Sequence, residues 1–157
     1  GDPRVFGVSL FDYDPMTLEA GFGAAAAVLE MLVQSHGGII RLFPSVPDRW
    51  HDAAFDALRA EGAFVVSSRL RGGRVVGARI VSEAGGLCRV RNDFGGPVRL
   101  AGTGVDGAGV ELSGEVLEFE TAAGGVYEVG AEMGEWPSYD RRAEDANFYG
   151  VKRLARF

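Results

Sequence analysis

Glycine placement is the sequence feature that most constrains the fold. The chain has 24 glycines, of which six fall in residues 1–61 and eighteen in residues 62–157. In the second part they stand singly or in small clusters between short segments in which apolar and polar residues alternate. Glycine supplies the positive backbone angles of tight turns, and alternation marks a strand with one buried face. Such strands are typical of an antiparallel sandwich or barrel, and for residues 62–133 we predict a β-sandwich.

Within this region the first two predicted strands form a hairpin. Apolar residues alternate in 64–70 and again in 76–80, and the turn falls at Arg71-Gly72-Gly73. The remaining predicted strands, in chain order, cover residues 87–91, 98–101, 110–112, 116–121 and 126–133.

A long helix is predicted before the strands, over residues 14–36. Its apolar side chains recur at three- and four-residue steps nearly all the way round, as in a buried helix. Asp14 is suited to cap it, Pro15 suits its first position, and His36 and the glycines after it suit its end. Gly21 and Gly23 inside it would permit close approach of a neighbour.

A second, shorter helix is predicted over residues 48–60, because Trp50, Ala54 and Leu58 fall on one side at helical spacing, with Phe55 beside them. A short strand or extended segment over 39–43 connects the two helices. The predicted fold is mainly β, an antiparallel sandwich preceded by one long and one short helix. A small sheet cannot bury the long apolar helix, so we expect the chain to begin partway through a helical domain.

Four parts of the chain follow from these patterns. They are a helical segment over 1–38, a connecting strand and short helix over 39–61, the sandwich over 62–133 and a tail docked on the rest over 134–157.

Composition excludes several classes of protein. With 46% hydrophobic residues the chain has enough apolar surface to fold. Its net charge of −6 argues against nucleic-acid binding, which needs a basic face. No apolar run is long enough to span a bilayer, so no membrane partner is expected. The start of the chain shows no signal-peptide pattern, so any signal peptide was removed or never present, and the compartment is left open.

Metal, cofactor and nucleophile sites find little support in the sequence. His36, His51 and Cys88 have no zinc-like spacing, and Cys88 alternates with Val90 as a core residue would. The segment 21–26 fits the dinucleotide fingerprint G-x-G-x-x-A, but it falls inside the long predicted helix instead of at a strand-to-helix turn. We therefore expect no metal and no cofactor.

Carboxylates are the remaining candidates for chemistry. Asp12, Asp14 and Glu19 cluster at the start of the long helix, and glycoside hydrolysis needs two carboxyl groups across the scissile bond. Acidic residues in a first helical turn also stabilise a helix by their interaction with its dipole, and they do so without any catalytic role. Residue types alone favour that structural interpretation.

An ordered series of motifs changes this balance. From Ser9 to about Val66 the chain resembles glycoside hydrolase family 95, the group of α-L-fucosidases and α-galactosidases. The motifs that carry the resemblance are Ser9-Leu10-Phe11-Asp12, Leu18-Glu19-Ala20-Gly21-Phe22-Gly23, Glu30-Met31-Leu32-Val33-Gln34-Ser35-His36, Ile40-Arg41-Leu42-Phe43-Pro44-Ser45-Val46-Pro47, Trp50 and Leu58-Arg59-Ala60-Glu61-Gly62-Ala63-Phe64.

The resemblance implies a fold and a mechanism. The first motifs belong to the end of an (α/α)6 catalytic barrel and the rest to a C-terminal β-sandwich. Family members are inverting enzymes in which a glutamic acid is the general acid and an asparagine, assisted by an aspartate, activates water. That aspartate lies in the motif Q-I-D-G-N-F-G, which reads Thr17–Gly23 here, so the resemblance implies a catalytic role for Glu19. Asp14 stands where the family has a histidine, and is the candidate substrate-binding residue.

The sequence departs from the family pattern at three places in and before this motif. Glu19 replaces the aspartate, Ala20 and Gly21 replace the glycine–asparagine pair, and Asp14 replaces the histidine. These changes fit either a branch with another substrate or one that has lost the chemistry. The resemblance places the general acid and the asparagines upstream of these residues.

Two hypotheses of different class follow. In the first, the chain is the C-terminal part of a family-95-like α-L-fucosidase-like glycosidase, inactive alone, whose partners are a fucosyl or galactosyl glycan and the upstream barrel. In the second, the β domain binds carbohydrate or stabilises the barrel without catalysis. Sugar binding would use exposed aromatics, for which Tyr127, Trp136 and Tyr139 are candidates, whereas Trp50, Phe64 and Phe119 are assigned to the core. An exposed apolar helix would also permit a homodimer.

Overall fold

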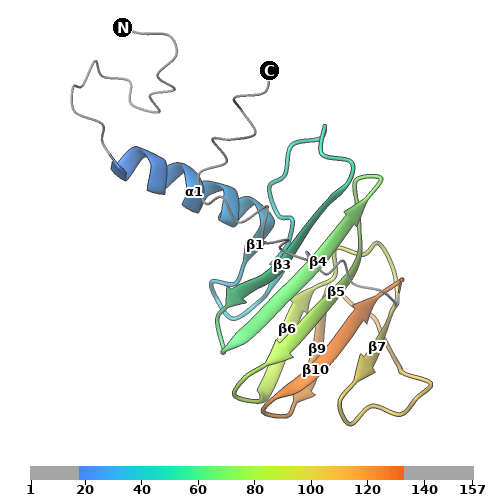
Figure 1. Cartoon of the computed structure of the whole chain (residues 1–157). Coiled ribbons are helices and arrows are strands. Elements are labelled where there is room, and N and C mark those ends of the chain that lie inside the picture. Colours follow the sequence, from blue (N-terminus) through green and yellow to red (C-terminus); the bar gives the residue numbers. More distant parts are fainter. Residues whose placement is uncertain (1–17, 133–157) are drawn as a thin grey trace, which may run out of the picture.

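The computed structural model describes residues 18–132, in which one helix precedes a mainly β, antiparallel structure (Figure 1). This arrangement confirms the predicted fold class, apart from the second helix. The elements in chain order are α1 (Leu18–Leu32), β1 (Val33–Gln34), β2 (Arg41–Leu42), β3 (Ala53–Ala60), β4 (Phe64–Arg71), β5 (Arg74–Ser82), β6 (Gly86–Arg91), β7 (Val98–Gly102), β8 (Val110–Leu112), β9 (Val116–Thr121) and β10 (Gly125–Gly130).

The strands form two sheets of unequal width and one short ladder. The large sheet has six strands in the order β3-β4-β5-β10-β7-β8, and β6 pairs with β9 in the second sheet. Ile40 extends the second sheet, because its N–H donates to Arg89 O and its carbonyl accepts from Arg91 N, each at 2.9 Å. The two-residue strands β1 and β2 pair with each other.

The core lies between the inner faces of the two sheets. Phe119 of β9 and Tyr127 of β10 meet across it with ring centroids 5.6 Å apart. The hydroxyl oxygens of Thr121 and Ser82 make a second cross-sheet contact at 2.8 Å. Burial of each large apolar side chain contributes about 1.5–3 kcal/mol, so this layer supplies most of the stability. Its largest fully buried apolar side chains are Leu42, Val66, Ile80, Cys88, Val90, Leu117 and Val129.

The strands after residue 62 agree with the alternation in the sequence. Strands β4 and β5 form the predicted hairpin, and Gly72 and Gly73 in its turn have φ angles of 54° and 75°. Two successive positive φ angles are typical of the hairpin turn that matches the twist of the strands. The large sheet also contains β3, and therefore begins before Gly62. The division into domains at that residue stays a prediction, and the tail over 134–157 lies outside the described residues.

The predicted short helix over residues 48–60 is wrong, because residues 53–60 form strand β3. A β-bulge explains part of the misleading pattern. The register moves from Phe55↔Ser68 to Leu58↔Val66, so β3 has one extra residue. Phe55 and Leu58 therefore both reach the core although they are three positions apart, which imitates helical spacing. Ala57 within the bulge has a φ of 57°.

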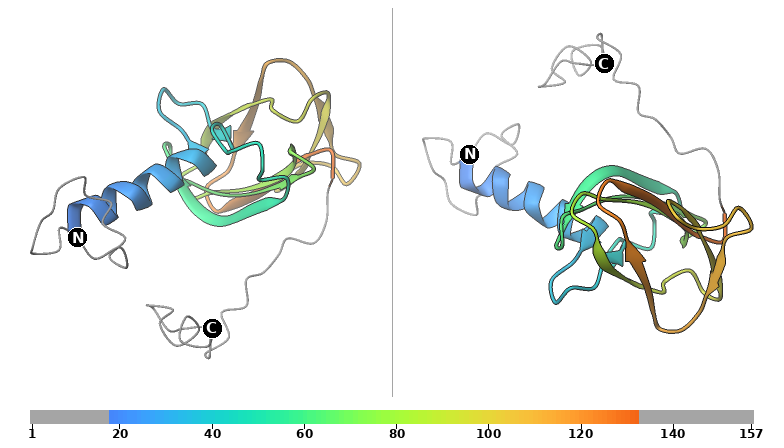
Figure 2. Two further views of the ribbon diagram at one scale, coloured as in Figure 1. Left: turned by 90° about the horizontal axis from the view of Figure 1, so that it is seen from above. Right: turned by 90° about the horizontal axis from the view of Figure 1, so that it is seen from below.

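The long helix ends earlier than predicted and is exposed. The structure has α1 ending at Leu32, because Val33 turns into the ladder with Leu42 and Phe43 N donates to Leu32 O at 2.7 Å. His36 thus lies in an exposed turn instead of the last helical turn. The helix extends away from the sheets (Figure 2), and its predicted start at Asp14 lies outside the described residues. With 15 residues, α1 is too short to be a membrane-spanning helix, and it is the only helix in the described part of the chain.

Ser67 is expected to stabilise the bulge. Its hydroxyl donates to Asp56 Oδ1 at 2.6 Å and accepts from Ala57 N at 3.1 Å. The substitution Ser67→Ala removes both bonds and should lower the free energy of unfolding by about 1–2 kcal/mol in urea titration. Ser113→Ala, at an exposed serine, is the matched control and should change it little. Equal stability of the two variants would contradict this role.

Candidate functional site

Helix α1 carries the candidate catalytic residue. Glu19 lies in its first turn and is exposed, while Asp14 lies outside the described residues. The structure therefore places one of the two candidate site residues and does not test their proximity. A carboxylate in the first turn stabilises the helix through the helix dipole, whether or not it has another role.

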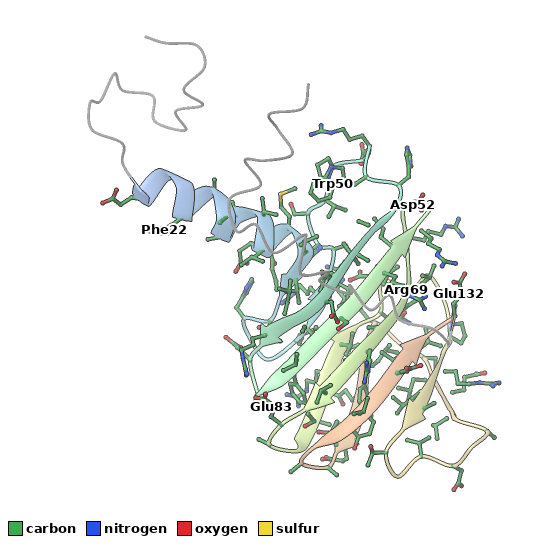
Figure 3. The ribbon with its side chains drawn as sticks, viewed as in Figure 1. Phe22, Trp50, Asp52, Arg69, Glu83 and Glu132 are labelled. Atoms are coloured by element: carbon green, nitrogen blue, oxygen red, sulfur yellow. The ribbon has the colours of Figure 1, made fainter. Side chains whose placement is uncertain are left out.

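Large apolar side chains accompany Glu19 on the same helix. Phe22 is 69% exposed, Leu29 is 48% exposed and Val28 is 45% exposed. Phe22 and Leu29 are seven residues apart and so share one face of the helix. Glu19 is three residues before Phe22, so these two side chains occupy neighbouring positions on the helix surface. Figure 3 shows Phe22 on the part of α1 that is distant from the sheets.

Gly21 and Gly23 have open surroundings in the described part of the chain. A Cβ built on either glycine meets no atom within 4 Å. The close approach that they were predicted to permit therefore remains a prediction. Both glycines lie inside α1, which begins at Leu18, so the G-x-G-x-x-A match lacks the strand-to-helix turn geometry of a dinucleotide site.

The aromatic residues of the sandwich belong mainly to its core. Tyr127 is wrong as a sugar-binding candidate, because it is only 2% exposed and its hydroxyl accepts a hydrogen bond from Ala122 N at 2.7 Å. Phe64 and Phe119 are core residues, as predicted. The assignment of Trp50 to the core is wrong, because it is half-buried and lies outside the core cluster. The other candidates, Trp136 and Tyr139, lie outside the described residues.

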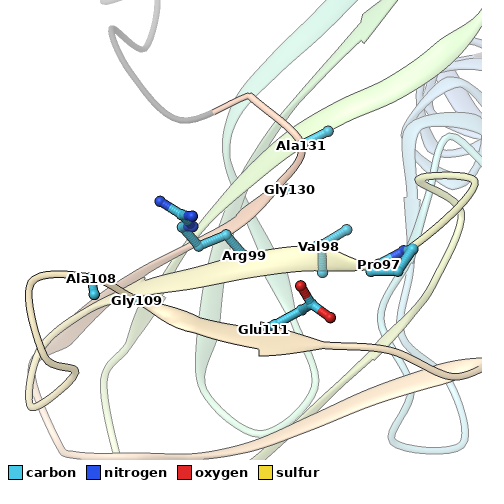
Figure 4. Close-up of a pocket in the computed structure, with 8 residues that line it drawn as sticks. All are labelled: Pro97, Val98, Arg99, Ala108, Gly109, Glu111, Gly130 and Ala131. Atoms are coloured by element: carbon cyan, nitrogen blue, oxygen red, sulfur yellow. The ribbon is translucent and has the colours of Figure 1, made fainter.

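An open pocket of about 570 Å³ lies at the opposite edge of the large sheet from α1 (Figure 4). Arg99 of β7 and Glu111 of β8 are cross-strand partners in its wall, and their charged groups point in different directions. The sequence analysis did not single out this pair, although each charge stands between two apolar residues of a strand. Strand order separates the pocket from Glu19, since α1 contacts β1 near the β3 edge and the pocket lies at β7 and β8.

Metal-ligating residues are dispersed in the described structure. Within residues 18–132, no three of the His, Cys, Asp and Glu side chains gather in a way that could hold a metal ion.

This architecture defines a class of protein. A helix with a carboxylate in its first turn and an exposed apolar face leads through a short extended segment into a β-sandwich whose strands are separated by glycine-containing turns. The family model "Glycoside hydrolase family 95, C-terminal domain" matches residues 34–129, and the chain therefore belongs to glycoside hydrolase family 95. This finding confirms the resemblance seen in the sequence.

One curated relative is consistent with the family. The chain is 40% identical over 72 residues to alpha-L-fucosidase 2 of Arabidopsis thaliana, a match that covers 45% of this chain and 8% of the relative. The chain thus corresponds to a small part of that relative's length.

Cys88 is confirmed as a core residue, being fully buried on β6. Burial raises the pKa of its thiol from 9.0 to about 12, because the thiolate is the charged form. We expect no reaction of the native chain with Ellman's reagent at pH 8 and one reactive thiol after denaturation, read at 412 nm. Stability should fall as the pH rises from about 9 towards 12, because the unfolded chain loses the thiol proton first. Rapid native labelling would contradict burial.

Proposed function

We propose that this chain acts as the C-terminal part of an inverting, α-L-fucosidase-like glycosidase, with Glu19 at the catalytic centre. The observation that carries the proposal is the exposed apolar face of α1 beside Glu19. The expected substrate is a fucosyl or galactosyl glycan. The expected structural partner is the catalytic barrel of the enzyme.

The apolar face of α1 requires a covering surface. Leaving Phe22, Val28 and Leu29 in water forfeits the stabilisation of about 1.5–3 kcal/mol that burial of each would give. Because Glu19 and Phe22 lie on neighbouring positions of the helix, a surface that covers Phe22 also approaches Glu19. Packing of α1 on a barrel would therefore bring this carboxylate into contact with the barrel.

A carboxylate at this place suits the family's chemistry. In inverting hydrolysis, one group takes a proton from water as the water attacks the anomeric carbon, while an acid protonates the departing glycosidic oxygen. Glu19 would orient or deprotonate the water, and the acid would come from the barrel. The longer side chain of glutamate moves the carboxylate by one methylene relative to the family's aspartate.

The β-sandwich has a structural role in this proposal. Its aromatic residues Phe64, Phe119 and Tyr127 are buried between the sheets and so contribute to stability. This burial favours stabilisation of the barrel over sugar binding by the sandwich, which is the alternative function.

Glu19→Gln is the direct test of the catalytic role. In a full-length family-95 enzyme that carries this segment, the variant should lower kcat by about 10²–10⁴-fold on 4-nitrophenyl α-L-fucoside or α-galactoside. Glu30→Gln, at an exposed glutamate three turns further along α1, is the matched control and should retain activity. Activity of Glu19→Gln within a few-fold of the parent would overturn the catalytic role.

The 157-residue chain alone should not hydrolyse these aryl glycosides, because it would lack the proton donor across the scissile bond. Release of 4-nitrophenol by the purified chain, abolished by Glu19→Gln, would contradict this expectation.

The exposed face of α1 also leads us to propose that the chain by itself forms a homodimer. Leu29→Ser should shift the molecular mass in light scattering towards the monomer. Val110→Ser is the matched control, since Val110 is also 48% exposed but lies on β8 at the other edge of the sheet. A monomeric parent chain at about 100 μM would overturn the dimer.

A further inference from the structure

Helix α1 is anchored to the sandwich at its last turn. Phe43 N donates to Leu32 O at 2.7 Å, and Leu32 packs against the core. Residues 21–23 and 25–30 are exposed, and the helix extends away from both sheets (Figure 2). The first turns of α1 therefore depend on the intrinsic stability of the helix, since the described part of the sandwich does not bury them.

The two ends of α1 differ in helix propensity. Towards the anchored end, residues 24–27 are four alanines, the residue type that most favours a helix. Towards the other end, Gly21 and Gly23 each lower the helix propagation constant about fivefold relative to alanine, and about 25-fold together. The favourable interaction of Glu19 with the helix dipole is worth about two- to fivefold. It therefore offsets at most one of the two glycines.

Nothing in the described part of the chain requires glycine at either position. Neither Gly21 nor Gly23 has a positive φ angle, and a Cβ built on either meets no atom within 4 Å. The charged residues of α1 are Glu19 and Glu30, so no pair of opposite charges within the helix compensates for the glycines. With 15 residues, α1 has a length at which even alanine-rich helices are marginal in water. The glycines therefore form a weak point between the alanines and Glu19.

Phe22 lies between the two glycines. It is 69% exposed and lies on the part of α1 that is distant from the sheets (Figure 3). Burial of a phenylalanine side chain is worth about 10- to 150-fold in an equilibrium constant, which is comparable to the cost of the two glycines. A surface that buries Phe22 can therefore order the turns that contain Glu19.

We propose that residues 18–23 lose their helical structure in the isolated chain and regain it when α1 docks on the catalytic barrel. Burial of Phe22 on the barrel offsets the cost of the two glycines, and the ordering of the same turns fixes the place of Glu19. The carboxylate thus gains a fixed position only in the assembled enzyme. The choice of the barrel as partner rests on the proposed function, whereas the loss of helix in the isolated chain does not depend on a catalytic role of Glu19.

Amide hydrogen exchange of the 157-residue chain, read by mass spectrometry, tests this proposal. When the first turns are helical, the amides of residues 22–25 donate to the carbonyls of residues 18–21. At about 1 μM, where mass action disfavours a homodimer, these amides should exchange within about twofold of the random-coil rate. In a full-length family-95 enzyme that carries this segment, their exchange should be at least about 100-fold slower.

Alanine substitution measures the part played by the glycines. Gly21→Ala combined with Gly23→Ala should slow the exchange of amides 22–25 in the chain alone about threefold, relative to the random-coil rate of the same sequence. Gly107→Ala is the matched control, because Gly107 is an exposed glycine with equally open surroundings in the loop before β8. It should leave the exchange of these amides unchanged.

The possible outcomes separate this proposal from the catalytic one. Slow exchange of residues 22–25 in the parent chain alone would overturn it, because the helix would then be formed before docking. Equally fast exchange in the full-length enzyme would also contradict it, as would an unchanged rate in the double alanine variant. Retained activity of Glu19→Gln would instead contradict only the catalytic role.

Discussion

The packing of a two-stranded sheet against a six-stranded one is the interaction on which the rest of the structure depends. The narrow sheet contributes Cys88, Val90, Leu117 and Phe119, all directed at the inner face of the wide one. Every strand that takes part must present apolar residues at alternate positions, which fixes its register. The same constraint explains why the β3 bulge is tolerated, since the extra residue restores the inward direction of Leu58.

The junction between helix and sandwich follows from the same core. Val33 is buried and pairs with Leu42, while Ile40 joins the second sheet beside Val90. These few residues hold the end of α1 to the sandwich, whereas its first turns lie free of both sheets. The helix is thus fixed at one end, and its other end, with Glu19, is exposed.

The sequence was sufficient to predict the strands after residue 62, because alternation and paired glycines are local signals. It failed at residues 53–60, where a bulge placed Phe55 and Leu58 three positions apart on one face and imitated a helix. The strand order, with β10 between β5 and β7, depends on long-range pairing and has no local signature. Glu19 could be selected only by family resemblance, since its helix-terminal position has a sufficient structural explanation.

The central place of β10 has a consequence for biosynthesis. It is the last described strand, and without it the wide sheet would consist of two separate parts, β3-β4-β5 and β7-β8. A ribosome must therefore synthesise the chain to residue 130 before the sheet can close, and pairing across such sequence separations is slow. Until then the apolar inner face of the sheet is exposed, and it can aggregate or bind chaperones. Premature termination between β8 and β10 would yield a product in which β5 and β7 both lack their partner, and quality control can recognise such unpaired strand edges.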